Sequence, residues 1–138
     1  MLLSRKKKAD VLAGLPLFSE CSRRELDAVA AVADELRLPA GREVMRQGAR
    51  GRELVVLLDG EVEVSRNGEV LATRGPGDFL GELALVTHRP RVATVTATTD
   101  LRVLVLERGA FERLVREVPS IALKVLKSVG ERLPAEDA

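Results

Sequence analysis

The central part of this sequence, from Val44 to Glu107, consists of short apolar runs that end at turn residues. The run Leu54 to Leu58 stops at Asp59-Gly60, which has the composition of a hairpin turn, and Glu61 to Val64 alternates with period two. Asn67-Gly68 predicts a second hairpin turn. Further strands are expected over 69–73, 92–98 and 101–106. Short strands separated by such turns are typical of β-sandwiches and barrels, so we expect a jelly-roll, or double-stranded β-helix, fold.

Helical spacing occurs only towards the two ends of the chain. Ser22-Arg23-Arg24-Glu25 fits a capping box, and the apolar residues that follow predict a helix over about 22–36. Helical spacing returns over about 108–133, where Pro119 separates two helices and Ser120 is expected to cap the second. The predicted fold is therefore mainly β with flanking helices (α+β).

The predicted organisation is a single folded domain with short polar ends. A basic N-terminal arm covers 1–9, the domain covers 10–133 with its β-roll over about 37–107, and a polar tail covers 134–138. The four cations from Arg5 to Lys8 would make a weak membrane anchor, so we interpret them as solvated. No apolar run approaches the roughly 20 residues of a membrane span, and no signal peptide is evident. The expected location is the cytoplasm.

Composition excludes several kinds of function. The 138 residues carry a net charge of +1, so no general basic field attracts nucleic acid. A single His and a single Cys cannot supply the usual zinc ligand sets or an internal disulfide. A cupin-type metalloenzyme, which usually needs several histidines, is disfavoured for the same reason. We expect a non-catalytic protein with neither metal nor cofactor.

The segment Gly81 to Ala97, GELALVTHRPRVATVTA, carries the most chemistry. Gly81 permits a backbone conformation that a side chain would block, and Glu82 to Leu85 favours a single helical turn. Arg91 follows the conformationally restricted Pro90. A carboxylate, outward amides and a guanidinium together suit a small anionic ligand that bears hydroxyls. The alternative is that Glu82 and Arg91 only pair with each other across a surface loop.

This segment resembles the phosphate-binding cassette of cyclic-nucleotide-binding domains, such as those of the catabolite activator protein and the cAMP-dependent kinase regulatory subunit. Gly81-Glu82-Leu83-Ala84-Leu85 and Pro90-Arg91-Val92-Ala93-Thr94-Val95 match its two parts, which places the cassette at 81–94. Leu15-Pro16-Leu17-Phe18-Ser19 and Gly75-Pro76-Gly77-Asp78 also resemble family features. The resemblance covers nearly the whole chain.

The resemblance implies a role for each matching position. Glu82 would accept the ribose 2′-hydroxyl, Arg91 would pair with the cyclic phosphate, and Gly81 would let the backbone approach the sugar. Backbone amides of three residues would also bind the phosphate: Leu83, Ala84 and Ala93. The last helix would be a lid that closes over the base and transmits occupancy.

The purine side of the expected site involves four residues. Val64 and Ala72 would line the base. Val92 stands where a Thr in related domains favours cGMP, so its lack of a hydroxyl favours cAMP, although its bulk could hinder either purine. Arg74 lies near the purine edge, where it could bond a base or simply be solvated.

The predicted function is a non-catalytic sensor of cAMP, or of cGMP, that regulates a protein effector through its lid helix. No helix-turn-helix segment follows the lid, so direct DNA binding is not expected. The alternative is a degenerate domain used for protein interaction or dimerisation without nucleotide. A homodimer through the C-terminal helix is left open.

A few other residues have side chains that could take part in function. His88 could titrate near neutral pH, but a surface role is favoured. Cys21 could be a redox thiol or haem ligand, and a second haem ligand other than His88 is lacking. Cations of the last helix could reach the nucleotide or remain solvated: Lys124, Lys127 and Arg132.

Overall fold

The computed structural model describes residues 2–131, and the chain divides into two compact units. One unit is continuous from Asp34 to Gly109 and contains the eight strands. The other unit combines the residues up to Ala33 with those from Ala110 onward and is helical where it is described. The sequence predicts one domain; the division between the two units falls inside α3 (Arg108–Glu117).

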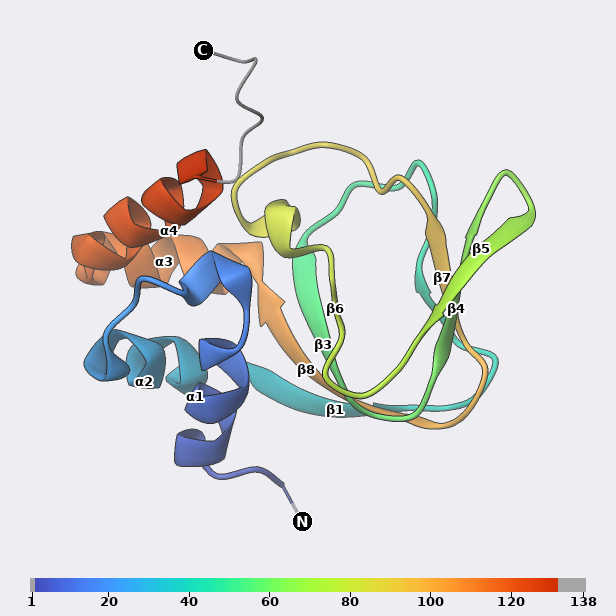
Figure 1. Cartoon of the computed structure of the whole chain (residues 1–138), viewed down its shortest axis with the longest axis horizontal. Helices are drawn as coiled ribbons and strands as arrows, with labels where there is room; N and C mark the ends of the chain where they lie inside the picture. Colours follow the sequence, from blue (N-terminus) through green and yellow to red (C-terminus); the bar gives the residue numbers. More distant parts are fainter. Residues whose placement is uncertain (1, 132–138) are drawn as a thin grey trace. The chain divides into compact units, whose positions relative to one another are not determined.

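The strand unit is built from two antiparallel sheets of four strands each (Figure 1). The first has the order β1-β8-β3-β6 and the second the order β2-β7-β4-β5. The strand bounds are β1 (Asp34–Leu38), β2 (Glu43–Met45), β3 (Glu53–Asp59), β4 (Val62–Arg66), β5 (Glu69–Arg74), β6 (Phe79–Leu80), β7 (Thr94–Ala97) and β8 (Leu101–Glu107). The predicted fold class, a β-roll with flanking helices, is confirmed.

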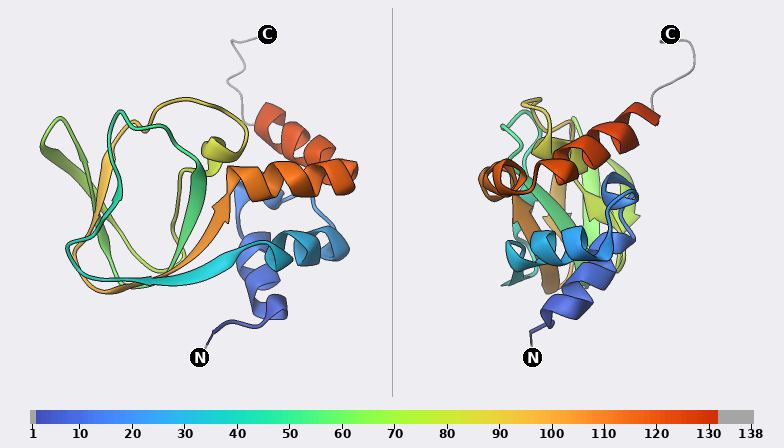
Figure 2. Two further views of the ribbon diagram at one scale, coloured as in Figure 1. Left: turned by 180° about the vertical axis from the view of Figure 1, so that it is seen from behind. Right: turned by 90° about the vertical axis from the view of Figure 1, so that its left-hand side faces the viewer.

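Figure 2 shows, from behind, the two sheets facing each other. An apolar core lies between them. Leu57 and Val103 enter it from the first sheet, and Val62 and Val95 from the second. Because alternate side chains of a strand point to opposite faces, the period-two pattern of the sequence gives each sheet one apolar inner face. Burial of each such side chain contributes about 1.5–3 kcal/mol.

One of the two predicted hairpin turns is present in the structure and the other is not. Asn67-Gly68 joins the paired strands β4 and β5, with φ of 53° and 80° as a type I′ turn requires, so this hairpin is confirmed. Asp59-Gly60 does not form a hairpin. β3 pairs with β6 and β8, whereas β4 pairs with β5 and β7, so this turn carries the chain from one sheet to the other.

The N-terminal helix prediction was partly wrong. The capping box at Ser22 and Glu25 is present, and it starts α2 (Arg23–Ala31). The helix stops there instead of reaching 36, because residues 34–38 form β1 and pair with β8. Pairing with a distant strand therefore decides the structure of a segment whose apolar spacing also fits a helix.

The prediction of a solvated arm over 1–9 is wrong for most of this segment, which belongs to a helix. α1 (Arg5–Ala13) begins at the N-cap Ser4 and buries Ala9 and Leu12. A 3-10 turn, η1 (Pro16–Phe18), follows it. The cations Arg5 to Lys7 are exposed, as expected, while Lys8 Nζ donates to the carbonyl of Ala33 across 2.7 Å.

The C-terminal helices are α3 and α4 (Pro119–Glu131). Pro119 is the first residue of α4, a position where its missing amide costs nothing, so Ser120 lies inside the helix and does not cap it. Ser120 Oγ instead donates to Glu25 Oε2 across 2.6 Å. The predicted end at 133, Arg132 and the tail 134–138 lie outside the described residues.

Candidate functional site

The candidate site begins at Gly81, directly after the end of β6. Gly81 has φ 73° and ψ 27°, in the left-handed region, and is followed by the 3-10 turn η2 (Glu82–Leu85). A Cβ at this position would collide with Arg91 Nη1 and would lie 2.9 Å from the Glu53 carbonyl oxygen. Only glycine meets both requirements, so the predicted need for a glycine backbone here and the single helical turn after it are confirmed, while the predicted approach to a sugar stays a prediction.

Arg91 is held in a slot between two glycines. Its side chain is 9% exposed, and Nη2 donates to the Glu53 carbonyl across 2.9 Å and to Glu53 Oε2 across 3.2 Å. On the other side, a Cβ on Gly51 would lie 3.0 Å from Nη1. The Arg91 amide also donates to the Ala49 carbonyl across 2.7 Å. Backbone and side chain are therefore both fixed.

The charge of Arg91 is incompletely compensated. Burial lowers the pKa of its guanidinium, the Glu53 carboxylate raises it, and the nearby Arg108 lowers it again, with a net decrease. An arginine stays protonated in spite of such a shift. Glu53 is partly exposed, and both of its contacts use Nη2. An anion that reached Nη1 or Nε would therefore form charge-assisted hydrogen bonds in a partly dry site.

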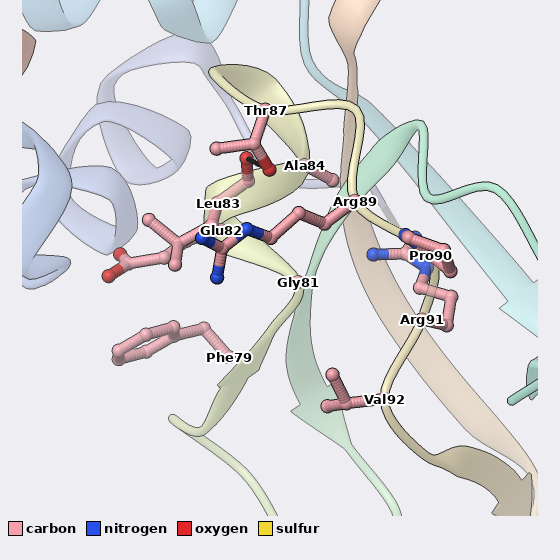
Figure 3. Close-up of a pocket in the computed structure, with 10 residues that line it drawn as sticks. All are labelled: Phe79, Gly81, Glu82, Leu83, Ala84, Thr87, Arg89, Pro90, Arg91 and Val92. Carbon is pink, nitrogen blue, oxygen red and sulfur yellow. Dashed lines mark hydrogen bonds between the residues drawn. The ribbon is translucent and has the colours of Figure 1, made fainter. Parts of the chain in front are cut away.

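The alternative in which Glu82 and Arg91 merely pair with each other is wrong. The ion-pair partner of Arg91 is Glu53. Figure 3 shows the carboxylate of Glu82 and the guanidinium of Arg91 on opposite sides of Gly81, pointing in different directions. Glu82 is buried. The two charged groups are thus separate parts of the site.

A cavity of about 360 Å³ lies against η2 and the loop that leads to Arg91 (Figure 3). This volume is within the range of about 300–1,000 Å³ typical of small-molecule sites. The residues that line it are Phe79, Gly81, Glu82, Leu83, Ala84, Thr87, Arg89, Pro90, Arg91 and Val92. Six of the seven cassette residues predicted to bind ligand are therefore brought together here.

Four predicted residues do not line this cavity. Ala93 is buried directly after Val92. Val64 and Ala72 are register partners on β4 and β5, and Val64 packs against the core. Arg74, the last residue of β5, is exposed, with Nη1 3.5 Å from the carbonyl oxygen of Thr73. Val92 itself is 70% exposed, so its bulk does not fill the cavity.

The amides of η2 are not all available to a ligand in this structure. The Ala84 amide donates to the Gly81 carbonyl across 3.0 Å, which closes the turn. Thr87 reinforces the same turn, because its amide and its hydroxyl both donate to the Leu83 carbonyl, across 2.8 and 3.0 Å. The amide of Leu83 has no acceptor among residues 2–131, so it is the freer of the two predicted donors.

Sequence reasoning missed three residues of this site: Gly51, Glu53 and Arg108. Nothing local marks Gly51 or Glu53, whose roles depend on Arg91, about 40 positions away by chain. Arg108 did carry a signal, because a cation in the first turn of a helix opposes the helix dipole and needs another reason to be there.

Three of the other candidates are accounted for by their local surroundings: Cys21, Lys124 and Lys127. Burial, assisted by Glu25, raises the pKa of Cys21 to about 11, which disfavours a reactive thiolate. Lys124 donates to Glu25 Oε1 across 2.5 Å, and Lys127 lies 3.2 Å from Glu20. Over residues 2–131 no three metal-binding side chains cluster, and no helix has the length and apolar character needed to cross a membrane.

Comparison with known proteins identifies the family. The family model for the cyclic nucleotide-binding domain matches residues 35–118, which include every strand but the first residue of β1, and the whole candidate site. The chain belongs to the cyclic nucleotide-binding domain family. The β-roll described above is therefore the fold of a family member.

Similarity to individual proteins supports this family assignment. The cAMP-dependent protein kinase regulatory subunit of Aspergillus fumigatus is 38% identical over 110 residues, which cover 78% of this chain but 26% of that protein. The chain thus spans about a quarter of the length of this relative. The N-terminal domain of a transcriptional regulator from Streptomyces coelicolor A3(2) superposes with a TM-score of 0.81 at 31% identity, covering 89% of this chain and 91% of that one. The cAMP-bound structure of PfPKA-R gives 0.68 at 30% identity, covering 91% and 47%.

Proposed function

We propose that this chain is a non-catalytic cyclic-nucleotide receptor that prefers cAMP and binds it in the cavity beside η2. The observation that carries the proposal is the Arg91 guanidinium, which is 9% exposed in its glycine slot. Among the described residues its side-chain contacts all run through Nη2 to the partly exposed Glu53. A singly charged cyclic phosphate would supply the missing compensation. The cAMP-bound state of one structural relative supports the choice of ligand.

The sugar and phosphate would be held by the cassette residues. Arg91 would pair with the phosphate, together with the amides of Leu83 and Ala93. The Ala84 amide would join them only if its bond to the Gly81 carbonyl opened. Glu82 would accept the ribose 2′-hydroxyl, a charge-assisted bond that contributes about 1.5–3 kcal/mol when shielded from water. The base would extend towards Val92 and the strands that carry Val64 and Ala72.

Occupancy of the site would be transmitted by a change in packing of the last helix, α4, which acts as the lid. A ligand changes a two-state equilibrium only by its difference in affinity for the two states. The output would be a change in the affinity of a protein effector, as expected for a regulatory domain without catalytic residues of its own.

Calorimetric titration of the purified chain with cAMP tests the proposal. We expect the parent protein to bind, Arg91→Ala to lose nucleotide-dependent stabilisation while remaining folded, and Arg91→Lys to recover little, because a point charge cannot make a bidentate phosphate contact. Arg46→Ala, which removes an exposed arginine paired with Glu43, is the control and should bind like the parent. Binding of cAMP by Arg91→Ala within about twofold of the parent would show that the cassette assignment is wrong.

A second candidate function, a protein-interaction or dimerisation module, is favoured by one feature. Leu123 and Leu126 of α4 are each 68% exposed, an unusual placement for large apolar side chains. If millimolar cAMP and cGMP give neither heat nor a thermal shift, this function replaces the first. Sedimentation of the parent and of Leu123→Gln/Leu126→Gln would then show whether α4 forms a homodimer.

A further inference from the structure

Arg108 is a buried cation with no acidic partner among the described residues. It follows β8 as the first residue of α3 and is 7% exposed. Its Nη2 donates to the Gly51 carbonyl across 2.5 Å, and its Nη1 donates to the Thr87 carbonyl across 3.1 Å and to His88 Nδ1 across 2.5 Å. A buried guanidinium is costly unless its donors are satisfied, and here two backbone carbonyls and a ring nitrogen satisfy them.

The acceptors of Arg108 lie on two segments next to Arg91: the one that contains Gly51 and the loop that contains Thr87 and His88. Gly51 forms one wall of the slot around the Arg91 guanidinium. Thr87 and His88 belong to the loop that joins η2 to Arg91, and Thr87 also closes η2 through its bonds to the Leu83 carbonyl. Arg108 is therefore bonded to both sides of the candidate anion site, while its own side chain does not line the cavity.

We propose that Arg108 is a positioning residue for the anion site: its guanidinium ties the Gly51 segment to the Thr87–His88 loop and thereby fixes Arg91 in its slot. The expected effect on nucleotide affinity rests on the proposed function. The positioning of Arg91 by Arg108 does not. Holding the slot before the ligand arrives removes an ordering cost from binding.

The geometry requires an arginine at this position. One guanidinium presents donors in a rigid plane, so Nη1 and Nη2 reach opposite segments at the same time. A lysine keeps the charge but has a single nitrogen, which cannot bridge two loops in that fixed arrangement. Because an arginine is always a donor, His88 Nδ1 acts as the acceptor in this contact.

Two measurements on the full chain test the proposal. The first is the NMR signal of the Arg91 Nε–H in the ligand-free protein, assigned by its loss in Arg91→Lys. In Arg108→Met and Arg108→Lys we expect it to move to the position and exchange rate of solvated arginines. The second is calorimetry with cAMP, where we expect at least a tenfold loss of affinity in both variants.

The matched control is Arg102→Met. Arg102 lies on β8, in the same unit, and pairs with Asp59 and Glu35 rather than with the loops around Arg91. Its substitution should lower the unfolding temperature while leaving the Arg91 signal and the cAMP affinity unchanged. If Arg108 only stabilised the fold, its variants would show the same pattern as Arg102→Met: a lower unfolding temperature with an unchanged Arg91 signal and cAMP affinity.

The outcomes separate this proposal from the proposed function. An unchanged Arg91 signal together with cAMP affinity within twofold of the parent, in a folded Arg108 variant, overturns the positioning role. If the parent fails to bind cAMP but its Arg91 signal still changes in the Arg108 variants, the proposed function fails and the positioning role stands. If Arg108→Met does not fold, the same two readouts on Arg108→Lys decide.

Discussion

At the scale of single residues, Val92 is expected to set the choice of base. It lines the cavity next to Arg91, and a valine offers no hydroxyl to the exocyclic amine of guanine. A missing hydrogen bond of about 0.5–1.5 kcal/mol corresponds to a roughly two- to twelvefold preference for cAMP over cGMP. Val92→Thr, which is nearly isosteric, should raise cGMP affinity relative to cAMP in competition titrations.

Arg74 provides the control for this prediction. Its guanidinium could donate to guanine O6 and N7, which would favour cGMP. The side chain is exposed and does not line the cavity, so Arg74→Leu should leave the ratio of the two affinities unchanged. A parent protein that prefers cGMP, and loses that preference in Arg74→Leu, would contradict the role given to Val92.

At the scale of secondary-structure elements, Glu25 joins the start of α2 to α4. It accepts from the Ser22 amide in the capping box, from Ser120 Oγ across 2.6 Å and from Lys124 Nζ across 2.5 Å. Burial alone raises the pKa of this carboxyl, but the hydrogen bonds from Lys124, Ser120 and Ser22 outweigh it and lower the pKa to about 2. The ionised form is therefore the one that stabilises the fold.

The depressed pKa predicts how stability depends on pH. Because the folded pKa is below the unfolded one of about 4.5, the contribution of Glu25 is complete above that pH and is lost as pH falls towards about 2. Glu25→Gln should lower the free energy of unfolding by about 1–3 kcal/mol at pH 7, and its difference from the parent should shrink over that acidic range.

Denaturant unfolding between pH 7 and pH 2.5 measures this difference. Glu112→Gln, at an exposed position of α3, is the matched control and should track the parent at every pH. A Glu25→Gln variant with the stability of the parent at pH 7 would show that the cluster around Glu25 does not stabilise the helical unit.

At the scale of the whole molecule, the lid proposal predicts a response to the ligand outside the strand unit. The family match ends at residue 118, so α4 lies just beyond it. Saturating cAMP should slow hydrogen exchange of the α4 amides several-fold, because a helix whose packing is selected by the ligand opens less often. The exchange is carried out on the full chain. Mass spectrometry of the peptides obtained by proteolysis after quenching then measures it for each segment.

The control for this experiment is Arg91→Ala under the same conditions, where α4 should exchange at the same rate with and without nucleotide. If cAMP binds the parent but leaves α4 exchange unchanged, α4 is not the element that reports occupancy.

Several features of the fold and site could be predicted from sequence because their causes are local. The capping box needs only Ser22 and Glu25, three positions apart. The hairpin turn needs only Asn67-Gly68, and the η2 turn needs only a glycine followed by helix formers. Each depends on backbone preferences within a few residues, which amino-acid type controls directly.

Other predictions failed because competing long-range contacts decided the outcome. Residues 34–36 have an acceptable helical pattern, yet they form β1 because β8 offers them a strand partner. Asp59-Gly60 has hairpin composition, yet its flanking strands pair in different sheets. A local pattern does not specify which distant strand is available, so these segments could not be assigned without the tertiary fold.

The sequence by itself determined the β-roll class, the glycine turn at 81 and the residue types that suit an anion. Only the tertiary structure decided what surrounds Arg91. Glu53 is 38 positions from it, and Arg108 and Gly51, which bond to each other, are 57 positions apart. Such contacts arise when sheet pairing brings remote segments together, and their geometry is fixed by packing rather than by local backbone preference.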